Sequence, residues 1–140
     1  ELERKILECE IAKLRGVVDG IHIDETGIFS VAHARALGFD GLAEEFLPVL
    51  LRELGRVDAR VIFVDTGPEI SWERRKGIYV DRGFSFVEME KARAKIDRTY
   101  TELMRLYEDL PFEKVIIENN SGDLEEFKGK IEKTINQILK

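Results

Sequence analysis

Three predicted strands, each ending in polar side chains, alternate with helical patterns and restrict the folds that this chain can adopt. The strands cover residues 17–24 and the apolar runs 60–65 and 114–118, and end at Asp24-Glu25, Asp65-Thr66 and Glu118-Asn119-Asn120. Short continuous apolar runs are typical of strands buried on both faces of a parallel sheet. Strands that alternate with helices form β-α-β units, and their carboxyl ends share one edge of the sheet. We therefore expect a parallel sheet with a ligand site at that edge.

Apolar side chains recur at helical spacing around these runs. The periodicity predicts helices over residues 1–15, 28–37, 42–54, 84–109 and 123–139. Pro48 is expected to kink the third of these helices or to begin a new one. Thr66-Gly67-Pro68-Glu69 has the T-x-x-E capping-box pattern with proline in the first turn, which predicts a short helix to about Lys76. Residues 77–83 are expected to form a loop.

Length and composition favour one soluble domain. The chain has 140 residues, of which 44% are hydrophobic and 36% charged. Its net charge of −6 argues against a nucleic-acid partner, because counterion release requires a basic face. No apolar run approaches the roughly 20 residues that cross a bilayer, so no membrane partner is expected. Cys9 is the single cysteine and cannot form an internal disulfide, which favours the cytoplasm.

Asp24 and Glu25 stand where the first predicted strand ends. A carboxylate in this position can hold Mg²⁺, or can accept a proton from an attacking hydroxyl group in phosphoryl transfer. The alternative is an ordinary solvated strand end, with Thr26 beginning the next helix. His22, inside the same strand, is more readily explained as a structural histidine than as a catalyst.

Cations gather after the second strand, at Arg74, Arg75 and Lys76. Arginine and lysine side chains there could hold phosphate groups. The alternative is that they complement the dipole at the end of a helix. The following segment, residues 77–83, has glycine at both ends and contains Arg82, so it suits a mobile lid and equally an ordinary connection.

Two further features have weaker implications. The turn Asn119-Asn120-Ser121-Gly122 could surround a purine base, although such a turn more often only joins a strand to a helix. His33 lies on a predicted helix and has no cysteine or histidine at metal-ligand spacing, so no zinc site is expected.

The order of these parts resembles the C-terminal two-thirds of a P-loop nucleoside or nucleotide kinase, closest to the thymidylate-kinase-like branch. In chain order, the matching residues are Ile23-Asp24-Glu25, Val61 to Asp65, Pro68-Glu69 with Arg74 following, Tyr100 to Leu103, and Val115 to Ser121. The similarity covers residues 17–139. It depends on order and spacing more than on any single motif.

The resemblance implies a three-layer α/β/α fold with a parallel sheet, in which residues 1–140 form one domain with a lid-like segment at 74–83. It implies transfer of the ATP γ-phosphoryl group to a small nucleoside, nucleotide or related metabolite. Asp24 would be the general base or Mg²⁺ ligand, with Glu25 assisting it, and Arg74 would neutralise charge on the transferred group. The expected ATP contacts are Arg75, Arg82, Asn119, Asn120, Ser121 and Gly122, and the expected acceptor contacts are Phe29, His33 and Arg35.

Two departures from the kinase pattern affect these expectations. Glu25 takes the place of an arginine that usually follows the family's aspartate. No G-x-x-x-x-G-K-[ST] loop occurs in the 140 residues, so the backbone cradle and lysine that bind the β-phosphate are absent from them. We therefore expect a P-loop segment, including the first strand of the sheet, to be supplied in cis or by another chain.

Two other functions remain open. One is a regulatory ATPase of the same fold, which binds nucleotide without phosphorylating an acceptor. The other is a non-catalytic interaction module that truly lacks the P-loop. The first predicted helix and residues 42–54 are candidates for a homodimer contact.

Overall fold

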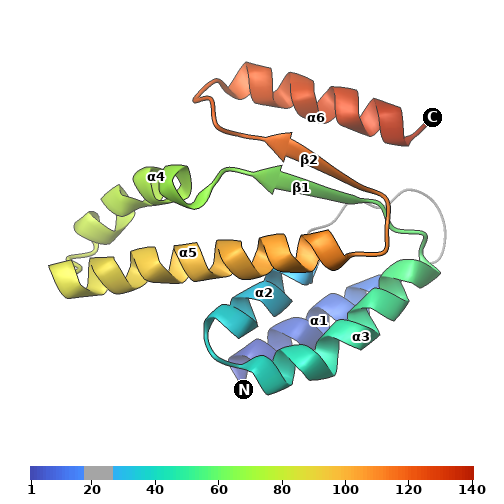
Figure 1. The fold of residues 1–140 in the computed structure, drawn as a ribbon, viewed down its shortest axis with the longest axis horizontal. Coiled ribbons are helices and arrows are strands. Elements are labelled where there is room, and N and C mark those ends of the chain that lie inside the picture. The colour runs from blue at the N-terminus through green and yellow to red at the C-terminus, as the bar shows by residue number, and fades with distance from the viewer. Residues whose placement is uncertain (18–26) are drawn as a thin grey trace. The chain divides into compact units, whose positions relative to one another are not determined.

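The computed structural model describes residues 1–17 and 27–140 of the chain. Within these ranges the protein is a mainly helical α/β protein, with six helices and one two-stranded parallel sheet (Figure 1). The elements are α1 (Leu2–Arg15), α2 (Ile28–Ala36), α3 (Asp40–Arg56), β1 (Val61–Asp65), α4 (Pro68–Asp81), α5 (Phe86–Asp109), β2 (Lys114–Glu118) and α6 (Leu124–Ile138). The predicted strand at 17–24 lies, apart from Val17, outside the described residues.

The chain divides into two compact units. The first contains Glu1–Ala59 and Arg98–Asp109, and the second contains Arg60–Asp97 and Leu110–Lys140. Helix α5 therefore contributes its carboxyl-terminal half to the first unit and its amino-terminal half to the second.

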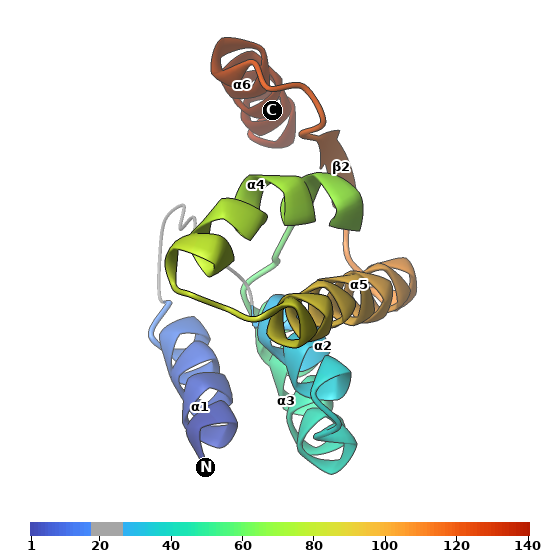
Figure 2. The same ribbon diagram turned by 90° about the vertical axis from the view of Figure 1, so that its left-hand side faces the viewer.

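The first unit is built on α1, α2 and α3, which pack together (Figure 2). Its core contains Leu7 and Ile11 from α1, Val31 from α2, and Phe46 and Leu50 from α3. Leu7 and Ile11 are four positions apart, as are Phe46 and Leu50, so each pair lies on one face of its helix. Gly27 lets α2 begin close to its neighbours, because an added Cβ would lie 3.0 Å from Glu10 Cβ and 3.2 Å from Leu50 Cδ1.

A buried carboxylate joins the ends of α1 and α3. Glu53 is only 7% exposed, and its oxygens accept hydrogen bonds from Arg56 Nε at 3.0 Å and Arg15 Nε at 3.3 Å. Arg56 also donates to the carbonyl oxygen of Leu14 at 2.6 Å. These bonds hold α3 against the last turn of α1. The hydrogen bond from Arg56, supported by that from Arg15, lowers the pKa of Glu53 below its ordinary value of 4.5.

This pKa gives a prediction for stability in acid. A carboxyl group whose pKa is lower in the folded state stabilises the fold above about pH 4.5 and loses that contribution as the pH falls through the folded value. Other carboxylates with lowered pKa values also contribute to the pH dependence of stability in the parent protein. The contribution of Glu53 is therefore obtained by comparing the parent with the Glu53→Gln variant. We expect the free energy of unfolding, measured in urea, to fall less steeply below pH 4.5 in this variant. Glu44→Gln, on the exposed side of α3, should match the parent, and equal slopes for both variants would contradict the assignment.

The second unit contains the sheet. β1 and β2 pair in parallel, as the sequence predicted, and in their register Val61 lies opposite Lys114 and Asp65 opposite Glu118. Helix α6 packs along β2 (Figure 1). Asp123 caps α6 by accepting hydrogen bonds from the backbone of Glu125 and Glu126. At the amino end of the sheet, Arg60 Nε donates to Glu113 Oε2 at 2.9 Å.

The sequence prediction is wrong about the extent of α4. Residues 77–81, expected to be part of a loop, continue the helix to Asp81. One interior glycine costs a helix only about 1 kcal/mol. The ring of Tyr79 stacks on that of Trp72, seven residues earlier on the same side of the helix, with centroids 5.7 Å apart. The lid-like segment 74–83 is therefore helical over most of its length.

The capping-box prediction at Thr66 is also wrong. Gly67 is the residue before the first turn of α4, and no side chain caps the helix there. Pro68 occupies the first turn as predicted, and its fixed φ sets the start one residue later than the T-x-x-E pattern suggests. An unpredicted capping box occurs instead at the start of α5, where Glu88 accepts hydrogen bonds from the backbone and hydroxyl of Ser85.

Two smaller predictions also need correction. No new helix begins at Pro48, because α3 runs through it from Asp40 to Arg56. Pro48 is exposed, where water can satisfy the carbonyl group that it leaves without a donor. The strands are not buried on both faces, since Val64 is 40% and Ile116 is 44% exposed. The described helices leave those two side chains uncovered.

The helical state of Gly77 gives a direct test of the corrected boundary. A Cβ added to Gly77 meets no atom within 4 Å, so Gly77→Ala should fit without a clash. We expect the variant to be more stable by about 0.5–1 kcal/mol, because alanine restricts the unfolded chain and favours a helix. Chemical denaturation measures this change. Gly83→Ala is the matched contrast: Gly83 has φ 74°, so alanine there should destabilise the protein.

The described ranges thus support the α/β class and a parallel sheet, while the three-layer arrangement stays a prediction. No helix in residues 1–17 and 27–140 is both long and apolar enough to cross a membrane.

Candidate functional site

The carboxyl ends of β1 and β2 form one edge, as expected for parallel strands. Asp65 and Glu118 are the last paired residues, and the backbone N–H of Asn119 donates to the carbonyl oxygen of Asp65 at 2.7 Å. The two segments that follow, beginning at Thr66 and Asn119, therefore leave the sheet side by side. This edge is where the sequence predicted a ligand site.

A tight turn carries the chain from β1 into α4. The Asp65 side chain accepts a hydrogen bond from the backbone N–H of Gly67 at 2.9 Å. Gly67 has φ 67°, in the left-handed region that favours glycine. Asp65 thus uses one carboxylate oxygen to fix the turn, so that α4 begins directly at the edge of the sheet.

Arg74 on α4 reaches the turn after β2. Its Nη2 atom donates to the carbonyl oxygen of Asn119 at 3.1 Å and to that of Ser121 at 3.0 Å. Arg74 and this turn were predicted from the sequence as separate parts of the site, and in the structure they are in contact. The Arg74 side chain remains exposed, so its guanidinium group is accessible to a ligand at the same edge.

The far side of the turn is fixed by α6. Asp123 caps the helix, as described above. Glu126 in its first turn interacts with Lys130 and with the hydroxyl group of Ser121, and the pKa of Glu126 is lowered mainly by the hydrogen bond from Lys130 and secondarily by that from Ser121. The turn at 119–122 is thus attached to β1, α4 and α6. Asn120 and Gly122 are exposed within it.

The other predicted cations lie on or next to α4. Arg75 is exposed on the helix, and Arg82 is exposed immediately after its last residue. Lys76 forms an ion pair with Glu73. Arg75 and Arg82 therefore share an element with Arg74, but their predicted contact with ATP stays a prediction.

The predicted acceptor residues belong to the first unit. The rings of Phe29 and His33 stack on α2, with centroids 6.0 Å apart and planes at 12°. His33 Nδ1 lies 3.4 Å from the hydroxyl oxygen of Thr99, and Arg35 Nη1 lies 4.0 Å from Glu102 Oε2. Thr99 and Glu102 are both on α5. Phe29 and His33 thus form one cluster with the α5 side chains, and Arg35 is part-buried beside it. Their role in binding an acceptor stays a prediction.

Asp24 and Glu25 lie outside the described residues, so their predicted roles as base and Mg²⁺ ligand stay predictions. Among the residues that are described, no group of three or more histidine, cysteine or acidic side chains is arranged to hold a metal ion. The candidate site therefore consists of the sheet edge, the turn at 119–122 and Arg74.

Comparisons of the chain with protein-family models, with curated proteins and with solved structures found no match. The class that the described residues define is a mainly helical α/β protein with a parallel strand pair.

Proposed function

We propose that the protein is the greater part of a P-loop-type kinase that transfers the γ-phosphoryl group of ATP to a small nucleoside, nucleotide or related metabolite. The proposal includes a three-layer α/β/α fold, completed by a strand and a phosphate-binding loop that these 140 residues do not contain. That segment would be supplied in cis or by another chain. With one cysteine and ATP as a substrate, the activity belongs in the cytoplasm.

One observation carries the proposal: the contact of Arg74 with the carbonyl oxygens of Asn119 and Ser121, at the carboxyl edge of parallel strands. Ligands of open α/β sheets bind beyond this edge. An exposed guanidinium group can stack on a base or donate hydrogen bonds to phosphate oxygens. The turn offers backbone groups that can surround a purine ring.

The residues present fit ATP better than they fit a metal ion. Arg74 would bind and orient the nucleotide, with Arg75 and Arg82 adding positive charge beside it. Asp65 is occupied in fixing the α4 turn, so the Mg²⁺ ligand of the proposal is Asp24. Bound Mg²⁺ would neutralise part of the charge on the phosphate oxygens during transfer.

Binding of Mg²⁺-ATP can be measured by thermal shift. The protein expressed from its gene is heated with and without Mg²⁺-ATP, alongside the 140-residue chain alone. A ligand at 100 times its Kd adds about 2.7 kcal/mol of stability, so binding should give a clear shift. Transfer to a panel of nucleosides and nucleotides then identifies the acceptor. ATP hydrolysis with no phosphorylated acceptor would favour the regulatory ATPase.

A second candidate, an interaction module, is favoured by one surface. Large apolar side chains are exposed around the turn between α4 and α5, at Ile78, Val80, Phe84, Phe86 and Val87, with Phe86 78% exposed. Clusters of this kind often bind proteins. A folded protein that shows no thermal shift with Mg²⁺-ATP would support this candidate over the kinase.

A further inference from the structure

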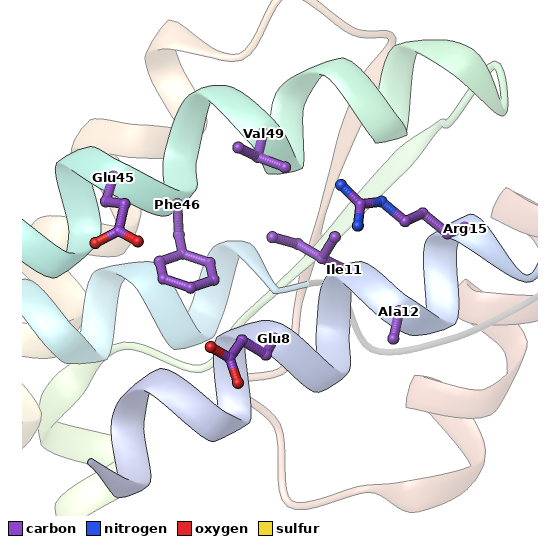
Figure 3. Close-up of a pocket in the computed structure, with 7 residues that line it drawn as sticks. All are labelled: Glu8, Ile11, Ala12, Arg15, Glu45, Phe46 and Val49. Atoms are coloured by element: carbon purple, nitrogen blue, oxygen red, sulfur yellow. The ribbon is translucent and has the colours of Figure 1, made fainter.

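A groove of about 420 Å³ lies between α1 and α3 of the first unit (Figure 3). Its floor is apolar and is formed by Ile11, Phe46 and Val49. Ala12, the small exposed residue beside Ile11, lies on its wall. The groove is separate from the sheet edge, and nothing in the proposed kinase function uses it.

Its two ends carry opposite charge. At one end Glu8 of α1 points toward Phe46, and Glu45 of α3 points toward α1 beside the Phe46 ring (Figure 3). Arg4 forms a two-pronged ion pair with Glu45, at 2.7 and 2.8 Å, so two carboxylates share one guanidinium group.

The opposite end of the groove is basic. Arg15 lines it, and Arg15, Arg52 and Arg56 all lie within 3.5 Å of the single carboxylate of Glu53. Three guanidinium groups therefore surround one carboxylate. The Arg15 side chain remains 57% exposed while its Nε contacts Glu53.

The helices that form the groove run in the same direction. Arg4 near the start of α1 pairs with Glu45 near the start of α3, and Arg15 at the end of α1 pairs with Glu53 near the end of α3. The charge therefore changes sign once along the groove, from acidic at the helix starts to basic at the helix ends.

We propose that this groove is a homodimer interface, in which a second copy of the chain packs against it in the reverse direction. A two-fold axis across the groove places Glu8 opposite Arg15 of the partner subunit, and the same pair forms again on the other side of the axis. Ile11 and Ala12 are midway between positions 8 and 15, so they flank the axis. The small side chain of Ala12 allows the two α1 helices to approach closely.

The change in the sign of the charge along the groove favours a second copy of the chain as its occupant. A uniformly acidic or basic partner would match one end of the groove and be repelled by the other. A reversed copy matches both ends. The chain carries a net charge of −6, so two copies repel each other at long range, and local complementarity at their contact is needed to offset that repulsion.

A charge swap tests the pairing. Sedimentation equilibrium over a concentration series would measure dimerisation of the whole chain, of Glu8→Arg, of Arg15→Glu and of the double variant. Each single change places like charges opposite each other in both symmetry-related contacts. It should raise the dissociation constant of the dimer at least tenfold. The double variant restores opposite charges and should recover most of the affinity. Lys13→Glu, on α1 but outside the groove, is the matched control and should leave the dimer unchanged.

A second variant covers the case in which Arg15→Glu unfolds the protein by disturbing Glu53. Ala12→Arg adds a long side chain at the axis on an exposed position, and circular dichroism would check that its helices remain. It should make the protein monomeric. A parent protein that is monomeric at all concentrations overturns the proposal. A dimer that tolerates Glu8→Arg and Ala12→Arg, or one that the double variant fails to restore, overturns it as well. None of these results depends on ATP binding.

Discussion

Replacing Arg74 by alanine is expected to lower the affinity for Mg²⁺-ATP about tenfold or more while leaving the fold intact. The change removes the cation and both hydrogen bonds to the turn at Asn119 and Ser121. Hydrogen bonds to charged groups contribute about 1.5–3 kcal/mol each, and solvent exposure places Arg74 at the low end. A loss of about 1.4 kcal/mol is tenfold in affinity. Calorimetric titration measures the binding, and kcat/KM measures the effect on transfer.

The chain offers a matched control for Arg74. Arg60→Ala removes an arginine that joins the same two strands through Glu113, but at their amino ends. It should change stability slightly and leave ATP affinity unchanged. Equal losses of affinity in both variants would mean that loosening of the sheet, and not a ligand contact, explains the effect. Unchanged binding in Arg74→Ala would show that the candidate site is assigned wrongly.

Replacing Leu50 by alanine should destabilise the first unit by about 2–5 kcal/mol, the usual cost of removing a large buried side chain and leaving a cavity. Leu50 is 1% exposed, and its Cδ1 lies close to the position of Gly27. Small domains have only about 5–15 kcal/mol of total stability, so the loss is a large fraction of it. Unfolding in urea, followed by circular dichroism, measures the change.

Leu2→Ala provides the comparison for Leu50→Ala. It removes the same atoms from a side chain that is 67% exposed, so its effect should be within about 0.5 kcal/mol of zero. Similar costs for the two variants would contradict the packing of α1, α2 and α3 described above. Two separate unfolding transitions would show that the units unfold independently, and only one of them should then respond to Leu50→Ala.

The sequence correctly predicted those elements that are indicated by several residues each. Helices α1, α5 and α6 each carry several apolar side chains at helical spacing, so one misleading residue changes little. β1 and β2 were found because short apolar runs ending in polar residues are distinctive. Their exposure was not predicted, because a run of apolar residues does not specify which helices cover each face.

Single-residue signals were less reliable, because local geometry decides them. Gly77 suggested a loop, yet Tyr79 and Trp72 pack together along a continued helix. Thr66 suggested a cap, yet Pro68 and the left-handed Gly67 set a later start. At the candidate site, Arg74 and the turn were both named from the sequence. Their contact was not, because they are separated by 45 positions or more and only the pairing of the strands brings them together.

That pairing also has a consequence for how the chain acquires its structure. Val61 pairs with Lys114, which lies 53 positions later, so β1 has no partner in β2 until both intervening helices and the second strand have been made. Contacts between residues so far apart in sequence form slowly, since the chain loses loop entropy before it gains the strand hydrogen bonds. Synthesis proceeds at about 5–20 residues per second, so several seconds pass between the synthesis of β1 and that of β2. Refolding should therefore show helix formation first, with the sheet edge that positions Arg74 and the turn assembling in a later kinetic phase.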